Sequence, residues 1–168
     1  MSTLNYKKQL LLAGCLFTLH NLEEAIGFSL FVYPPDLPLD MIPLKANAMI
    51  LAIGLITGIA WALILWANHQ LKETNKKNLL IILVSIFLFN AFFPHIAGTI
   101  ILHRYFPAVI TSIVLYLPYS FWILPKLYRS YVSPEYFFGI IIRGLFLAGS
   151  LVIILQLIIT IIFRFFTN

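Results

Sequence analysis

The chain has 168 residues, of which 61% are hydrophobic and 10% are charged. Soluble proteins carry about 25% charged residues, so this composition excludes an ordinary soluble domain and predicts a protein whose solvent is lipid. The formal net charge is +5. The basic residues are divided among several connections, however, and this argues against a nucleic-acid-binding face.

Five apolar stretches follow one another along the chain. Each is close to or above the length of about 20 residues that a helix needs to cross about 30 Å of hydrocarbon. Because the connections between them are short, no separate soluble domain fits. We therefore predict an all-α fold in which residues 1–168 form a single membrane domain, a bundle of five transmembrane helices. These helices cover approximately residues 9–33, 46–67, 78–101, 106–124 and 137–163.

The basic residues predict the orientation of this bundle, because cytoplasmic connections of membrane proteins carry an excess of lysine and arginine. We therefore expect a cytoplasmic N-terminus, an external C-terminus and a location in a bacterial-type plasma membrane. In a five-span arrangement, the side of the N-terminus holds Lys7, Lys8, Lys72, Lys76, Lys77, Lys126 and Arg129. The opposite side holds Lys45, Arg104 and Arg164.

The first stretch carries ionisable side chains where lipid is expected. Here the chain reads His-Asn-Leu-Glu-Glu, so His20 precedes Glu23 and Glu24 by three and four residues. Residues at these spacings share one face of an α-helix. At a rise of 1.5 Å per residue, His20 lies about 16 Å from the start of the stretch. Polar groups at such depth are costly, and they are usually functional.

The third stretch brings further polar groups to a similar depth. Counted from Asn78, Asn90 lies about 18 Å and His95 about 25 Å along a helix. Pro94 cannot donate the backbone hydrogen bond to the carbonyl of Asn90, so we expect a kink there. Because the first and third stretches run in the same direction, we expect Asn90 and His95 to face the polar group of the first stretch.

Two carboxylates and two imidazoles together suit a divalent metal ion. A cation removes the repulsion between neighbouring carboxylates, and these ligand types are those of zinc and iron sites. We predict His20, Glu23, Glu24 and His95 as metal ligands, Glu23 and Glu24 as acid–base groups, Asn90 as a supporting residue, and zinc or iron as the cofactor. Two other interpretations stay open: side chains that only hold helices together, and a path for protons or ions.

The pattern His-x-x-Glu-Glu at residues 20–24, set in an apolar helix, resembles the HXXEE family of small membrane proteins. The resemblance implies a second histidine later in the chain, which we match to His95. His103 is the alternative. It lies beside Arg104, about 37 Å along the third stretch, so we expect it at the membrane surface.

The resemblance covers about residues 17–118 and includes a Tyr-x-Pro turn, found here at residues 105–107. In the family this turn typically continues with glycine, whereas this chain has Ala108. The resemblance implies no established reaction, so it supports the site without supplying a mechanism.

These features favour a metal-dependent intramembrane enzyme, namely a hydrolase, an oxidoreductase or an isomerase. Its partners would be membrane lipid and a lipid or other hydrophobic small-molecule substrate. Two further functions are kept as alternatives. One is a small transporter or proton-coupled carrier in which Glu23 and Glu24 titrate as the substrate passes. The other is a non-catalytic assembly subunit whose polar cluster pairs with a helix of another protein.

Overall fold

All regular secondary structure in the part of the chain that the structure describes is helical. The computed structural model describes residues 4–30, 46–131 and 133–167, and no strand occurs among them. The predicted all-α fold is therefore confirmed. In chain order the elements are α1 (Tyr6–Leu30), α2 (Ala46–Gln70), α3 (Glu73–Asn90), η2 (Ala91–Ile96), α4 (Ala97–Leu102), α5 (Val109–Thr111), η3 (Ser112–Tyr116), α6 (Leu117–Tyr128) and α7 (Pro134–Thr167).

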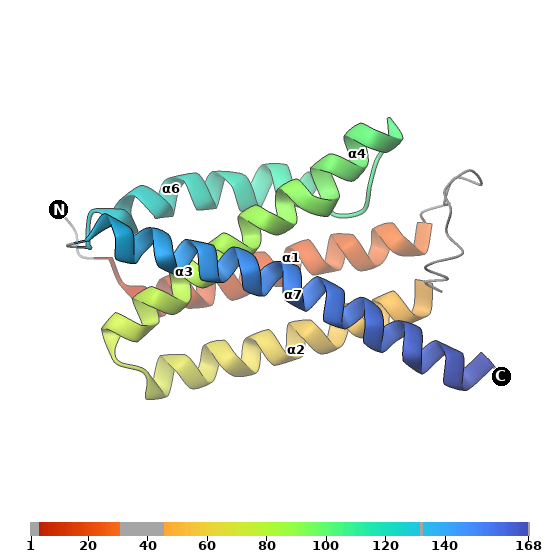
Figure 1. Ribbon diagram of the computed structural model, residues 1–168, viewed down its shortest axis with the longest axis horizontal. Coiled ribbons are helices and arrows are strands. Elements are labelled where there is room, and N and C mark those ends of the chain that lie inside the picture. Colours follow the sequence, from red (N-terminus) through yellow and green to blue (C-terminus); the bar gives the residue numbers. More distant parts are fainter. Residues whose placement is uncertain (1–3, 31–45, 132, 168) are drawn as a thin grey trace.

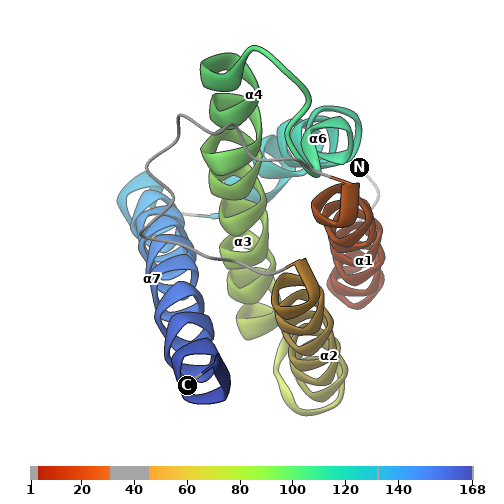
Figure 2. The same cartoon turned by 90° about the vertical axis from the view of Figure 1, so that its right-hand side faces the viewer.

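The helices lie roughly along one axis of the molecule, and the chain runs back and forth along it (Figure 1). α1, α3 and α7 start at the end where the N-terminus lies, whereas α2 and α6 run back toward that end. Viewed along the bundle, α3 is central, and it contacts α1, α6 and α7 (Figure 2). Leu80, Val84 and Phe87 of α3 accordingly belong to the buried hydrophobic core.

Four helical segments are long and apolar enough to cross a membrane. They are Met49–Gln70, Glu73–Leu102, Val109–Tyr128 and Pro134–Leu151. The second and third of these combine several elements, because η2 joins α3 to α4 and η3 joins α5 to α6. Four of the five predicted transmembrane helices therefore qualify by length and composition among the described residues.

The remaining predicted span is α1. Its 25 residues would extend about 37 Å, which exceeds the hydrocarbon thickness of a bilayer. It carries Lys7 and Lys8 at its start and His20, Glu23 and Glu24 further along, and these residues lower its mean hydropathy. The predicted site residues of α1 are thus among the side chains that make this helix less hydrophobic than the four candidate spans.

The third predicted helix is broken near Pro94. α3 ends at Asn90, and Phe93 within η2 has extended backbone angles (φ −138°, ψ 112°) before α4 continues. The predicted kink is therefore confirmed. His95 follows the break directly and is fully buried, so the change of direction brings its imidazole into the bundle.

The connection between α4 and α5 contains two residues with positive φ. His103 (φ 50°) ends α4 and Ala108 (φ 63°) precedes α5. Positive φ values favour glycine. Glycine is also the residue that the HXXEE resemblance implies at the position of Ala108. Pro107 lies against α1, since a Cβ at Gly27 would be 2.7 Å from the Pro107 Cβ. The missing side chain of Gly27 therefore lets the connection approach α1 closely.

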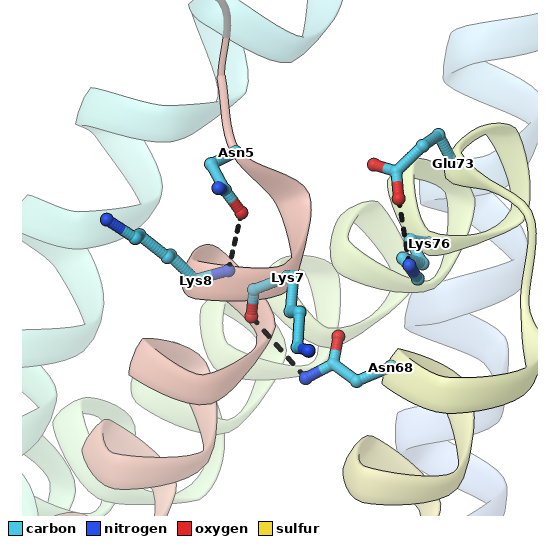
Figure 3. Close-up of polar contacts among 6 residues, drawn as sticks. All are labelled: Asn5, Lys7, Lys8, Asn68, Glu73 and Lys76. Atoms are coloured by element: carbon cyan, nitrogen blue, oxygen red, sulfur yellow. Dashed lines mark hydrogen bonds and ion pairs between the residues drawn. The ribbon is translucent and has the colours of Figure 1, made fainter.

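The end of the bundle at which the N-terminus lies collects basic residues and polar contacts (Figure 3). Lys76 forms an ion pair with Glu73 at 2.8 Å, and the Asn68 side chain donates to the carbonyl of Lys7 at 3.4 Å. The second bond joins the end of α2 to the start of α1. All seven basic residues predicted for the N-terminal side lie at this end of the bundle. Two are at the start of α1, three are in the α2–α3 connection or the first turns of α3, and two are at the end of α6.

Candidate functional site

His20 of α1 and His95 of η2 meet in the interior of the bundle. Their Nε2 atoms lie 3.2 Å apart, both side chains are fully buried, and the two rings pack edge to face with centroids 4.7 Å apart. Glu24 joins them, because one ligand atom from each of the three residues lies within 4.8 Å of the others. We call His20, Glu24 and His95 the His–Glu cluster.

The partner of His95 Nδ1 determines which nitrogen of that ring carries the proton. Nδ1 lies 2.6 Å from the carbonyl oxygen of Pro107. A carbonyl oxygen only accepts hydrogen bonds, so Nδ1 must be the donor. In a neutral imidazole the other nitrogen then has no hydrogen. The free lone pair of His95 Nε2 therefore points toward His20.

The partners of His20 lead to the same assignment. Asn90 Nδ2 donates to His20 Nε2 at 2.9 Å. Thr111 Oγ1 lies 3.0 Å from His20 Nδ1 and donates its own proton to the carbonyl of Ala108 at 3.3 Å. Thr111 therefore accepts from Nδ1, and Nε2 of His20 carries a lone pair. Two nitrogens that each carry a lone pair thus lie 3.2 Å apart, an arrangement that a shared cation would stabilise.

The geometry of the two histidines matches that of a metal site. Zinc–nitrogen bonds are about 2.0–2.1 Å, so two nitrogens on a tetrahedral ion lie about 3.3–3.4 Å apart. The two Nε2 atoms are 3.2 Å apart. Histidines that bind metals also donate their second N–H to a carbonyl or another polar group, which fixes the ring. His20 and His95 both have such a partner.

Glu23 is not part of the His–Glu cluster and binds the segment from Tyr105 to Thr111, which we call the 105–111 turn. Its Oε1 accepts from Tyr105 Oη at 2.8 Å and from the backbone N–H of Ile110 at 3.2 Å. Its Oε2 accepts from the backbone N–H of Thr111 at 2.7 Å. These N–H groups belong to the first turn of the helix that begins with α5, where a negative charge is stabilising.

The 105–111 turn therefore connects Glu23 to both histidines. It presents the Pro107 carbonyl to His95 and the Thr111 hydroxyl to His20, and Glu23 holds it against α1. Partial burial, together with the hydrogen bond to Glu23 and the charge of that carboxylate, raises the pKa of Tyr105 to about 12. The phenol therefore stays protonated at neutral pH and keeps its role as a donor.

Tyr116 of η3 covers the cluster from a further side. Its ring stacks on His20 with centroids 4.2 Å apart and on Phe87 with centroids 4.1 Å apart. Its hydroxyl is buried and has no hydrogen-bond partner among the described residues. An unpaired buried hydroxyl costs about 1–3 kcal/mol. A water molecule or a ligand at the cluster could remove that cost.

The structure brings together most of the residues that the sequence predicts for the site. His20, Glu24 and His95 form one group, and Asn90 contacts it through His20. Glu23 is not in this group. His103 is exposed at the end of α4, so it is His95 that faces His20.

The sequence prediction gave no role to Pro107, Thr111 or Tyr116. Thr111 and Tyr116 stand out in the sequence as polar residues in an apolar stretch, and that signal does not reveal which way they point. The role of Pro107 rests on its backbone carbonyl, for which a sequence carries no signal.

Comparisons with known proteins match the part of the chain that carries these residues. A family model described as "Protein of unknown function with HXXEE motif" matches residues 11–123. The chain is also similar to the uncharacterized protein YrkK of Bacillus subtilis (strain 168), with 24% identity over 111 residues, 66% of this chain and 69% of the relative. No solved structure matches the chain. The His–Glu cluster and the 105–111 turn both lie inside the matched region.

Proposed function

Because this chain belongs to the HXXEE family, whose description assigns no function, we propose a function from the geometry of its site. The protein is an integral membrane enzyme that binds one divalent metal ion at the His–Glu cluster and acts on a lipid or another hydrophobic small molecule. The observation that carries this proposal is the pair of buried imidazoles whose Nε2 atoms lie 3.2 Å apart beside Glu24.

The proposal includes five membrane crossings with a cytoplasmic N-terminus. α1 supports this because it is long enough to cross and lies beside α2 and α3 in the bundle. The basic residues gathered at the N-terminal end of the bundle support the orientation. A polar α1 is tolerated in lipid because its buried face, including His20 and Asn21, packs against other helices.

The ligand set is of the catalytic type. Structural zinc sites use four protein ligands, whereas catalytic sites use three and keep a position for water or substrate. Two histidines and one carboxylate are also the ligands of non-haem iron enzymes. When bound, such an ion would supply Lewis-acid chemistry or an activated water molecule.

The protein residues take distinct roles in this proposal. His20, His95 and Glu24 bind the ion, while Asn90 occupies the lone pair of His20 Nε2 until the ion takes it. Glu23 is a positioning residue, because both of its oxygens accept hydrogen bonds from the 105–111 turn. The apolar helices around the cluster favour a substrate that dissolves in the bilayer.

Elemental analysis of the full chain, purified in a mild detergent, tests the proposal. We expect about one zinc or iron ion per chain, lost on treatment with a chelator and regained when the metal is added back. A folded protein that holds no metal after purification and binds none on addition would refute the metal site. If such a metal-free protein showed pH-dependent uptake into liposomes, the carrier interpretation would replace the enzyme.

A further inference from the structure

Three buried hydroxyl groups follow one face of the helical segment that η3 and α6 form. They belong to Ser112, Tyr116 and Ser120, which are spaced by four residues and therefore share a face of the helix. All three residues are fully buried, and none of the three hydroxyl oxygens has a hydrogen-bond partner among the described residues. Ser85 of α3 is equally buried, but its hydroxyl donates to the carbonyl of Ile81 at 2.8 Å. We call Ser112, Tyr116 and Ser120 the hydroxyl row.

The hydroxyl row begins beside the His–Glu cluster. Ser112 follows Thr111, whose hydroxyl lies 3.0 Å from His20 Nδ1. The Tyr116 ring stacks on the ring of His20 with centroids 4.2 Å apart. Ser112 and Tyr116 are also the first and last residues of η3, a single turn of π-helix, and such turns are frequent at functional sites. One end of the hydroxyl row is therefore in contact with a proposed metal ligand.

The other end of the row approaches the end of the bundle at which the N-terminus lies, because α6 runs back in that direction (Figure 1). Tyr119 is adjacent to Ser120 in the chain, and its hydroxyl lies 3.3 Å from two oxygens of Gln9 in the first turn of α1. Gln9 is about 16 Å from His20 along α1, and Tyr119 is about 12 Å from Thr111 along its own helix. The polar groups therefore extend over roughly half of the hydrocarbon thickness, which is about 15 Å.

Water is the ligand that suits these oxygens. Buried polar groups in proteins are nearly always hydrogen-bonded, and a buried water molecule makes about three hydrogen bonds to groups that otherwise have no partner. A hydroxyl group both donates and accepts, so successive hydroxyls can bind the water molecules of one file. Residues 105–125 include no Asp, Glu, Lys or Arg. The row itself therefore supplies no charge that would compensate a buried ion.

We propose that the hydroxyl row binds a file of water molecules that leads from the N-terminal end of the bundle to the His–Glu cluster. The file needs no metal ion, because its partners are the three hydroxyl groups. In the proposed enzyme it would supply the water molecule that a bound ion activates. Only this last role rests on the proposed function.

X-ray footprinting of the full chain in a mild detergent tests for this water. X-rays convert water into hydroxyl radicals, which oxidise a side chain beside a bound water molecule even where bulk solvent does not reach. Tyr116 and Phe87 are a matched pair, because both rings are buried, they stack on each other, and both react readily with these radicals. We expect Tyr116 to be oxidised several-fold faster than Phe87. Equal rates for the two rings would overturn the proposal.

Serine-to-alanine variants locate the water. Ser112→Ala and Ser120→Ala each remove a partner of the file, so the oxidation rate of Tyr116 should fall about threefold or more. Ser85→Ala is the control, because it removes an equally buried hydroxyl that already has a partner in the protein. It should leave the rate at Tyr116 unchanged. Equal effects of all three variants, or no effect of any, would contradict a water file along this row.

Thermal unfolding gives a second measurement, and the sign of its result separates a hydrated row from a dry one. If the row is dry, Tyr116→Phe removes an unpaired buried hydroxyl and should raise Tm. If water is bound there, the same change removes a hydrogen bond and should lower Tm by about 1–4 °C. We expect the decrease, and an increase would refute the water file.

The water file and the metal site can fail independently. Footprinting is made on chelator-treated protein, whereas the metal content is measured by elemental analysis. Bound metal together with equal oxidation of Tyr116 and Phe87 would refute the file and leave the metal site. Faster oxidation of Tyr116 in a protein that binds no metal would support the file and refute the metal site. The comparison of the two rings uses the unmodified chain, so it decides even if a variant does not fold.

Discussion

His20 and His95 face each other through their Nε2 atoms at 3.2 Å, while one turn of the chain holds the opposite nitrogen of each ring. The Pro107 carbonyl fixes His95 and the Thr111 hydroxyl fixes His20. Both Nε2 atoms therefore carry a lone pair before any ion arrives, and that of His20 accepts a hydrogen bond from Asn90. Such preorganisation lowers the cost of binding, because the rings need not be ordered again.

Removing either imidazole should abolish tight metal binding. We expect His95→Ala to lower the affinity for zinc by more than about 100-fold, since a ligand contributes more than its supporting hydrogen bonds. His103→Ala is the matched control, because His103 directly follows the same span and is exposed at the end of α4. Competition with a chromophoric chelator measures both variants. Equal losses in the two variants would contradict the assignment of His95.

The Thr111 hydroxyl should tune the affinity without being a ligand. Thr111→Val removes the acceptor for His20 Nδ1 at nearly constant volume, and supporting partners of this kind are worth about 10–100-fold in metal affinity. Thr111→Ser keeps the hydroxyl and should restore most of the affinity. The same chelator competition serves here. An unchanged affinity in Thr111→Val would show that the bond at 3.0 Å does not hold the ring.

The adjacent glutamates should respond differently to the same substitution. Glu24→Gln removes the carboxylate of the His–Glu cluster, so the metal content should fall below about a tenth of an ion per chain. Glu23→Gln should retain a bound ion at saturating metal but destabilise the fold by about 1–3 kcal/mol, because charge-assisted hydrogen bonds to the 105–111 turn are lost. Metal content and thermal unfolding in detergent separate the two effects. The reverse pattern would make Glu23 the ligand.

Ala108→Gly should stabilise the protein. Ala108 has φ 63°, a conformation that costs an L-residue about 1–2 kcal/mol and glycine little. After the entropy that glycine adds to the unfolded chain, we expect a gain of about 0.5–1 kcal/mol, or a rise in Tm of roughly 1–4 °C. Ala62→Gly in the interior of α2 is the control and should lower Tm. A decrease in both variants would contradict the strained turn.

The helical fold and the core of the site could be predicted because they depend on simple periodicities. The lengths of the apolar stretches predict the helices, and the rise per residue places His20 at a depth near that of Asn90. Pro94 predicts the break after α3. The direction of the break depends on the packing of η2 against α5 and η3, so the sequence did not show that it brings His95 into contact with His20.

The different contacts of Glu23 and Glu24 could not be predicted. Both glutamates lie within about one turn of His20 on a helix, so helical periodicity predicts either of them equally well as a metal ligand. The 105–111 turn makes their surroundings different, because it provides Glu23 with two backbone N–H groups and the Tyr105 hydroxyl as hydrogen-bond donors. Those partners lie more than 80 residues away in the chain, and only tertiary structure brings them to α1.

X-ray absorption spectroscopy of the zinc-loaded full chain tests the central claim most directly, because it reports the atoms bound to the ion. We predict two imidazole nitrogens and at least one carboxylate oxygen at about 2.0–2.2 Å. The imidazole signal should be halved or lost in His95→Ala and unchanged in His103→Ala. A spectrum with no imidazole scattering, or one that changes in His103→Ala and not in His95→Ala, would contradict a metal site formed by His20, Glu24 and His95.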